Sequence, residues 1–121
     1  MIQSIAFTVY PVSDISAARN FYENVLGLKL SRNFNDQWIE YDVGDGTFAL
    51  TTMQMGHTPG AKGAVVAFEV DNLDLTVAEL KAKSVPVVLE PMPTPVCRMA
   101  VIADPDGNHV TLHRRNAVDS A

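Results

Sequence analysis

The sequence predicts an α+β domain in which two paired βαβββ modules form a concave, partly open mixed sheet with the helices on its outer face. The same order of patterns occurs twice along the chain: an apolar strand, a capped helix and three further strands. The residues that precede the two helices also correspond, VSD at residues 12–14 and VDN at residues 70–72. A repeat of this length indicates two modules rather than a solenoid.

The length of the chain indicates a single domain. With 121 residues it can bury one sizeable core but not the cores of two independent domains. We expect the first module at about residues 1–53 and the second at about residues 63–116. The hydrophobic periodicity disappears between them, so residues 54–62 are interpreted as a linker.

The first module begins with an apolar, β-rich strand pattern at residues 2–10. Ser13 or Asp14 can cap the following helix, and Gly27 is expected to end it. Three strands follow at residues 28–34, 36–43 and 47–52, and the last two are joined by the hairpin signal GDG at residues 44–46.

The second module repeats this plan after the linker. A strand at residues 63–70 precedes a capped helix at 71–84, which carries Leu73, Val77 and Leu80 on one side. Strands are then predicted at residues 85–91, 96–104 and 108–114. The last two strands are separated by the turn sequence DPDG at residues 104–107, where the glycine accommodates a positive φ.

The charge and composition of the chain exclude several classes of function. A net charge of −5 and a pI near 4.9 argue against binding nucleic acid or an anionic membrane surface. No apolar run is long enough to span a membrane, and the N-terminal residues lack the features of a signal peptide. The single cysteine excludes an internal disulfide. We therefore expect a cytoplasmic protein.

Two segments resemble a known family. Residues 8–30, TVYPVSDISAARNFYENVLGLKL, are similar to the opening module of the vicinal oxygen chelate superfamily, and residues 97–112, CRMAVIADPDGNHVTL, resemble its closing hairpin. This group includes glyoxalase I, bleomycin-resistance proteins, fosfomycin-resistance enzymes and extradiol dioxygenases. The resemblance covers nearly the whole chain and implies the paired-module fold, which hosts many different functions. It also leads us to expect a homodimer.

Metal-using members of this superfamily bind one divalent ion with a ligand from each of four strands. The resemblance places these four positions at Phe7, Ala49, Val65 and Thr111. None of these side chains is an imidazole or a carboxylate, the ligands that catalytic divalent metals prefer. The residues therefore predict no metal site and no cofactor, although the resemblance implies the fold.

Strand alternation predicts which side chains of the first module face away from the helices. If the GDG segment at residues 44–46 contains a two-residue loop, we expect Asp42 to pair with Ala49 and Glu40 to pair with Thr51. Residues opposite each other in a ladder share a face. Trp38 lies on the same face, either as a half-buried structural residue or as a platform on which a ligand ring stacks.

In the second module the turn at residues 104–107 places Val101 opposite Thr111 and Met99 opposite His113. The resulting face is largely apolar with a few converging polar groups, which is the character of a small-molecule pocket. The predicted lining residues are Phe7, Val9, Trp38, Glu40, Ala49, Thr51, Val65, Ala67, Glu69, Cys97, Met99, Val101, His109, Thr111 and His113.

Each polar group on this face has a structural interpretation beside a functional one. Glu40 is either a solvated rim residue or a general base, and Glu69, at the end of its strand, fits a rim or helix-capping role better than catalysis. His109 and His113 stand four residues apart on one strand, so they cannot bind the same metal ion as neighbours. Each could still join Glu40 or Glu69 across the cleft, but they are interpreted as rim or ligand-contact residues. Cys97 is interpreted as a small apolar filler.

Three hypotheses for function follow. The first is a metal-free protein that binds a small, partly apolar or aromatic molecule, as bleomycin-resistance proteins of this fold do. The alternative is a lyase or other enzyme of the superfamily that works without the usual metal or with a displaced one, with Glu40 or His113 as acid or base. The third is an interaction module whose pocket is vestigial. We favour the binding protein.

Overall fold

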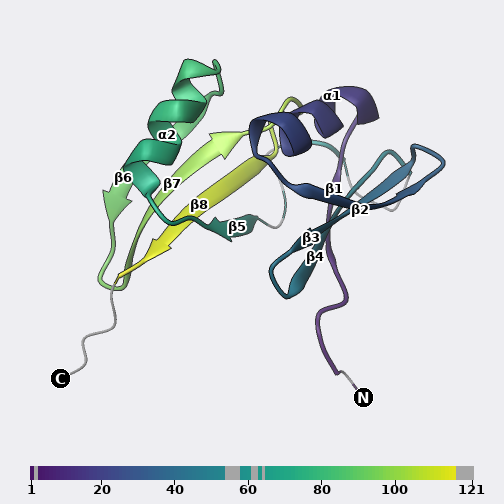
Figure 1. The fold of residues 1–121 in the computed structure, drawn as a ribbon, viewed down its shortest axis with the longest axis horizontal. Coiled ribbons are helices and arrows are strands. Elements are labelled where there is room, and N and C mark those ends of the chain that lie inside the picture. The colour runs from purple at the N-terminus through teal and green to yellow at the C-terminus, as the bar shows by residue number, and fades with distance from the viewer. Residues whose placement is uncertain (2, 54–57, 61–62, 64, 117–121) are drawn as a thin grey trace. The chain divides into compact units, whose positions relative to one another are not determined.

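The computed structural model describes residues 1, 3–53, 58–60, 63 and 65–116. The chain divides into two compact units, and each is considered separately. The first unit comprises Met1–Gly63 together with Pro105–Asn108, and the second comprises Ala64–Asp104 and His109–Ala121 (Figure 1). Each unit contains one strand, a helical segment and three further strands, which confirms the predicted α+β class and the paired βαβββ pattern.

The first unit has a four-stranded mixed sheet in the order β1-β4-β3-β2. Strand β1 pairs parallel with β4, whereas β2, β3 and β4 form antiparallel pairs. The elements are β1 (Thr8–Pro11), α1 (Ile15–Arg19), the π-helix η1 (Asn20–Val25), β2 (Lys29–Phe34), β3 (Trp38–Val43) and β4 (Gly46–Thr51).

The helical segment of the first unit begins and ends where the sequence predicts. The carboxylate of Asp14 accepts a hydrogen bond from the backbone N–H of Ala17 at 3.1 Å, as an N-cap does. Gly27, at a φ of +77°, follows the last helical turn. Tyr22 is fully buried and its ring lies 5.1 Å from that of Phe48 on β4, so the helical segment covers that face of the sheet.

Two predictions for the first unit are wrong. The first strand begins at Thr8 rather than near residue 2, and residue 2 itself lies outside the described residues. The physical reason lies in the partner strand: Thr8 is aligned with Phe48 in a parallel ladder, and β4 begins only at Gly46. Of the described residues, those before position 6 therefore have no part of β4 beside them.

The predicted register of the β3–β4 hairpin is the second error. Val43 pairs with Gly46, so Glu40 lies opposite Ala49 and not opposite Thr51, and Asp42 lies opposite Thr47 rather than Ala49. The two-residue loop is formed by residues 44–45, with the first glycine of GDG at a φ of +59°. The shift is two residues, which equals the side-chain period of a strand, so the assignment of residues to faces is unchanged.

The second unit has the same sheet plan, in the order β5-β8-β7-β6 with β5 parallel to β8. Helix α2 lies against one side of this sheet and buries Leu73, Val77 and Leu80, as predicted (Figure 1). The elements are β5 (Val66–Glu69), α2 (Leu73–Ala82), β6 (Val87–Pro93), β7 (Cys97–Ala103) and β8 (His109–Arg115).

The β7–β8 hairpin has the predicted register, with Val101 opposite Thr111 and Met99 opposite His113. Gly107 has the expected positive φ, at +83°. Residues Pro105–Asn108, which include most of this turn, belong to the first unit: Asp106 accepts hydrogen bonds from the backbone N–H and the hydroxyl of Ser13, and the Asn108 amide donates to the carbonyl of Pro11 at 3.1 Å. The turn signal alone contained no indication of these contacts.

The predicted linker at residues 54–62 lies mostly outside the described residues, since residues 54–57 and 61–62 are not among them. In its described part, the backbone N–H of Gly60 donates to the side-chain oxygen of Asn108 at 2.9 Å. Among the described residues, no helix is long and apolar enough to cross a membrane.

Candidate ligand-binding faces

The first open face is the side of the β1-β4-β3-β2 sheet opposite the buried face that holds Phe48. Because side chains alternate along a strand, the packing of Phe48 against Tyr22 directs its neighbour Ala49 to the other side. The ladder then aligns Val9, Ala49 and Glu40 in one row and Thr51 with Trp38 in the next. The residues predicted for this face are therefore brought together on it.

An aromatic pair marks the first open face. The rings of Phe7 and Trp38 lie edge to face, with centroids 5.1 Å apart and an interplanar angle of 88°. Phe7 precedes β1 and is 41 % exposed. The indole N–H of Trp38 donates to a carboxylate oxygen of Glu40 at 2.8 Å. Glu40 thus holds the indole in place and satisfies its one polar atom.

The smaller residues of the first face are enclosed. Thr51 is only 2 % exposed, and its hydroxyl donates to the carbonyl of Gln37 at 2.8 Å while accepting from the backbone N–H of Met53 at 3.0 Å. Ala49 is fully buried. Both residues therefore support the strand ends and the floor of the sheet, while Phe7 and Trp38 provide the accessible aromatic surface.

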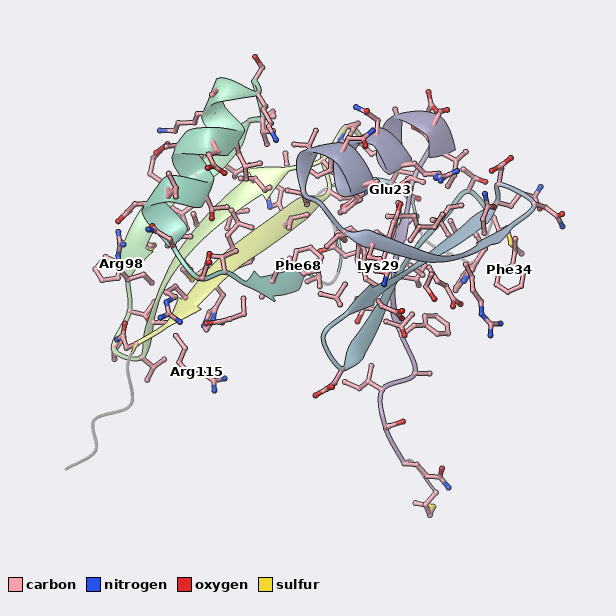
Figure 2. The ribbon with its side chains drawn as sticks, in the orientation of Figure 1. Glu23, Lys29, Phe34, Phe68, Arg98 and Arg115 are labelled. Carbon is pink, nitrogen blue, oxygen red and sulfur yellow. The ribbon has the colours of Figure 1, made fainter. Side chains whose placement is uncertain are left out.

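The second open face is the side of the β5-β8-β7-β6 sheet that faces away from α2. Arg98 identifies the helix side, because its guanidinium lies 2.9 and 3.0 Å from the two carboxylate oxygens of Asp74 on α2. Figure 2 labels Arg98 beside α2. The neighbouring Cys97 consequently belongs to the open side, as predicted. Two rows cross this face: Glu69, His113, Met99 and Met92, and Ala67, Thr111, Val101 and Leu89.

The second open face is mostly apolar. Val65, Ala67, Leu89 and Met92 are exposed, whereas Thr111 is buried in the middle of its row. The sequence reasoning missed Leu89 and Met92, because β6 has two irregularities in its register and does not alternate regularly. The proline in the middle of this strand pattern, at position 91, was the signal that could have indicated a bulged edge strand.

One end of the second face carries a carboxylate–imidazole pair. Pairing of β5 with β8 sets Glu69 opposite His113, and Oε1 of Glu69 lies 2.5 Å from Nδ1 of His113. The other oxygen of Glu69 accepts the backbone N–H of Arg115 at 2.8 Å and lies 3.9 Å from the Arg114 guanidinium. The hydrogen bonds from Arg115 and then from His113 lower the pKa of Glu69.

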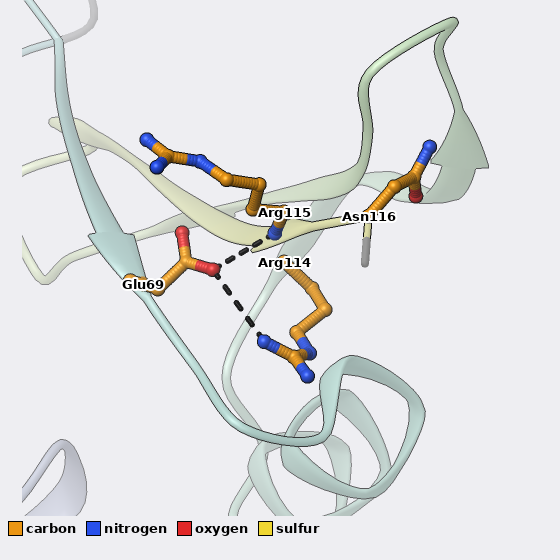
Figure 3. A pocket seen from close by; sticks show the side chains of 4 residues that line it. All are labelled: Glu69, Arg114, Arg115 and Asn116. Atoms are coloured by element: carbon orange, nitrogen blue, oxygen red, sulfur yellow. Dashed lines mark hydrogen bonds and ion pairs between the residues drawn. The ribbon is translucent and has the colours of Figure 1, made fainter. Parts of the chain in front are cut away.

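A shallow pocket lies beside this pair. It measures about 350 Å³ and is lined by Glu69, Arg114, Arg115 and Asn116 (Figure 3). Figure 3 shows the Glu69 side chain between the two arginines, with its interactions to both drawn. Glu69 is exposed at this pocket.

Cys97 and His109 lie apart from the Glu69–His113 pair. The Cys97 thiol is buried and lies 3.0 Å from the hydroxyl of Thr94, which also accepts the backbone N–H of Cys97 at 3.0 Å. His109 is half-buried and pairs with Ala103 at the opposite end of β8 from His113. The two histidines are therefore in different rows of the sheet.

The four positions that the resemblance leads us to compare with metal ligands, Phe7, Ala49, Val65 and Thr111, have no imidazole or carboxylate side chain of their own. Across the ladder, Ala49 has Val9 and Glu40 as neighbours, and the Glu40 carboxylate is bonded to the indole N–H. Thr111 is flanked by alanine and valine side chains in its row. In the part of the chain that the structure describes, no three His, Cys, Asp or Glu side chains are grouped so as to hold a metal ion.

The chain belongs to the Glyoxalase/Bleomycin resistance protein/Dioxygenase superfamily, whose profile matches residues 4–112. The paired βαβββ modules agree with this family. Comparison with the curated proteins gives no match.

Several solved structures are similar to this chain. TnmS3, described as an antibiotic binding protein from Streptomyces sp. CB03234, is 27 % identical with a TM-score of 0.81, covering 95 % of this chain and 98 % of its own. A glyoxalase/bleomycin resistance protein from the same strain is 29 % identical with a TM-score of 0.76, covering 90 % of this chain and 98 % of its own. A lactoylglutathione lyase from Agrobacterium tumefaciens shares the fold at 21 % identity and a TM-score of 0.75, covering 94 % and 95 % of the two chains.

Proposed function

We propose that this protein binds a small, partly apolar or aromatic molecule without the help of a metal ion. The observation that carries this proposal is the accessible Phe7–Trp38 pair on the first open face. Phe7 occupies the position where metal-using members of the superfamily carry their first ligand, so a ring replaces a metal-binding group there.

The geometry of the pair suits contact with another ring. Edge-to-face and offset arrangements of aromatic rings contribute about 0.5–1.5 kcal/mol beyond the burial of their area. Because Glu40 satisfies the indole N–H, the part of Trp38 that remains available is hydrocarbon. Val9 adds an apolar neighbour in the adjacent row. A flat, apolar ligand would therefore gain both burial and ring contacts.

The similarity to TnmS3 supports the same class of ligand. That protein is described as antibiotic binding, and its fold covers nearly the whole of this chain at 27 % identity. The lack of imidazole and carboxylate side chains at the four expected metal positions supports binding without a metal.

The single tryptophan makes the proposal directly testable, since Trp38 gives one indole cross-peak in a ¹H–¹⁵N spectrum. Titration with 1-naphthol and 1-methoxynaphthalene should shift this cross-peak saturably, and the affinity should be unchanged after dialysis against a chelator. Leu75→Ala, on the exposed side of α2, is the matched control and should bind as the wild type does. If neither probe shifts the cross-peak saturably, the proposal is refuted.

A metal-dependent role is distinguished by a second measurement. The purified protein should contain no stoichiometric divalent metal, and Ni²⁺, Zn²⁺, Mn²⁺ or Fe²⁺ should not raise its melting temperature. One bound equivalent of metal per chain would contradict metal-free binding.

An enzyme of the superfamily that works without the usual metal is the second candidate. The Glu69–His113 pair favours it, because an imidazole held by a carboxylate is a common proton acceptor in catalysis. Turnover of a hemithioacetal, epoxide or catechol that is lost in His113→Gln would support this alternative.

We also expect a homodimer, and light scattering that gives the mass of one chain would contradict that expectation.

A further inference from the structure

We propose that His113, oriented by Glu69, accepts a hydrogen bond from a hydroxyl group of the ligand, so that the preferred ligands are hydroxylated aromatic molecules of the phenol type. This inference rests on the proposed binding function and specifies the class of ligand. It concerns the second open face, where the pair stands at one end of an apolar surface.

Glu69 determines which nitrogen of the His113 imidazole carries the proton. Both oxygens of Glu69 are engaged, one with Nδ1 of His113 at 2.5 Å and the other with the backbone N–H of Arg115 at 2.8 Å. An ionised carboxylate has only lone pairs to offer, so Nδ1 must be the donor. In the neutral imidazole the proton then resides on Nδ1, and Nε2 presents a lone pair.

The lone pair on Nε2 of His113 is accessible. The His113 side chain is 27 % exposed, and among the described residues no hydrogen-bond partner of Nε2 is found. A carboxylate that fixes one imidazole nitrogen also fixes the orientation of the ring. The sheet therefore holds an oriented acceptor at its surface.

The surroundings of this acceptor are mostly apolar. In its row, His113 has Met99 and then Met92 beside it, and the next row presents Ala67, Val101 and Leu89. Methionine side chains adapt their shape to apolar ligands and contact aromatic rings favourably. A molecule with an apolar ring and one hydroxyl donor matches both parts of this surface.

The acceptor selects for a ligand that carries a proton to donate. A phenol has such a proton, whereas the corresponding ether has none. The geometry therefore favours a phenol over the corresponding methyl ether.

The ligand preference is tested with 1-naphthol and 1-methoxynaphthalene, which differ only in the hydroxyl proton and its methyl replacement. The wild type should bind 1-naphthol about three- to tenfold more tightly, the range expected for one net hydrogen bond. The ¹⁵N signal of His113 Nε2 should shift with 1-naphthol and not with its ether. In the free protein the same spectrum should show the proton on Nδ1.

The Glu69→Gln variant separates an orienting role from a structural one. The backbone N–H of Arg115 needs an acceptor, so the amide oxygen of the new side chain should face it and the NH₂ group should face Nδ1. The imidazole proton should then move to Nε2, and the preference for 1-naphthol should disappear. Glu79→Gln, the same change at an exposed position of α2, is the control and should retain the preference.

The outcomes distinguish this inference from the proposed function. Equal affinities of the wild type for the two probes would overturn the inference and leave the binding function intact. A proton on Nε2 in the wild type, or an unchanged preference in Glu69→Gln once its proton has moved, would also overturn it. If neither probe binds, the proposed function and the inference both fail.

Discussion

Each open face contains a glutamate that orients a ring, but the two rings offer different chemistry. On the first face, Glu40 accepts the indole N–H of Trp38 and leaves only hydrocarbon for a ligand. On the second face, Glu69 engages one nitrogen of His113 and leaves the other as an acceptor. Two copies of one module plan thus present an apolar contact surface and a hydrogen-bonding group, which shows that side chains rather than topology set the chemistry of each face.

The largest expected effect is a loss of stability when the buried core beneath the first open face is disrupted. Phe48 is almost fully buried and contacts the rings of Tyr10, Tyr22 and Tyr41. Phe48→Ala should lower the free energy of unfolding by about 3–5 kcal/mol because it leaves a cavity in the core. Urea unfolding followed by circular dichroism measures this, with the exposed Leu75→Ala as the control. A loss below about 1 kcal/mol would mean that the core under this face is dispensable.

Loss of the ring at position 7 sharpens the comparison between the faces. Phe7→Ala removes the partner of Trp38, so the affinities of the first open face for 1-naphthol and 1-methoxynaphthalene, measured at the Trp38 indole cross-peak, should both fall by about three- to tenfold. The ratio of the two affinities at this face should stay constant, because Phe7 contacts the ring of a probe and not its hydroxyl. A change in the ratio alone would show that Phe7 acts on the hydroxyl and not on the ring.

Glu23, in the helical segment that covers the first sheet, should make the stability of the fold depend on pH. The hydrogen bond from Arg19, followed by that from the Tyr41 hydroxyl, lowers the pKa of Glu23 below its ordinary value of 4.5. Since the folded-state pKa is depressed, Glu23 stabilises the fold above the ordinary value, and this contribution is lost as the pH falls through the folded-state value.

Unfolding of the wild type and Glu23→Gln tests this dependence. The variant should be less stable at about pH 7, and the difference should narrow as the pH is lowered to about 3. Glu23→Asp, which keeps the charge, should retain more of the pH dependence. A difference that is constant between these conditions would contradict the assigned cause.

The smallest effect is expected from Glu40→Gln, the counterpart of Glu69→Gln. The neutral indole N–H needs only an oxygen acceptor, which an amide also provides, so probe affinities should change by less than about twofold. The indole proton shift of Trp38 measures the retained hydrogen bond. An effect as large as that of Glu69→Gln would remove the distinction between the two glutamates.

Local signals predicted most of the secondary structure. Asp14, Asn72 and Gly27 bound the helical segments, as their capping chemistry indicates. The β7–β8 register was predicted correctly, whereas that of β3–β4 was displaced by two residues, since GDG allows more than one two-residue loop. The switch to a π-helix at Asn20 had no comparable signal.

The candidate residues were also named from the sequence, but the sequence did not decide which of them bond to one another. Glu40, Glu69, Trp38 and His113 were assigned to the open faces by alternation, and alternation says nothing of how far a side chain reaches. Glu69 meets His113 because β5 pairs in parallel with β8, and these strands are far apart in the chain. Leu89 and Met92 joined the second face only through the irregular pairing of β6.

The amino-acid pattern was sufficient for the repeated module plan, the family and the absence of metal-ligating side chains at the four expected positions, because each depends on residue type and short-range spacing. The tertiary structure was needed to show which glutamate bonds to an indole and which to an imidazole, and to show that Asp106 and Asn108 bond to Ser13 and Pro11. The Glu69–His113 contact arises from pairing between distant strands, whose register depends on side chains packed across the whole sheet.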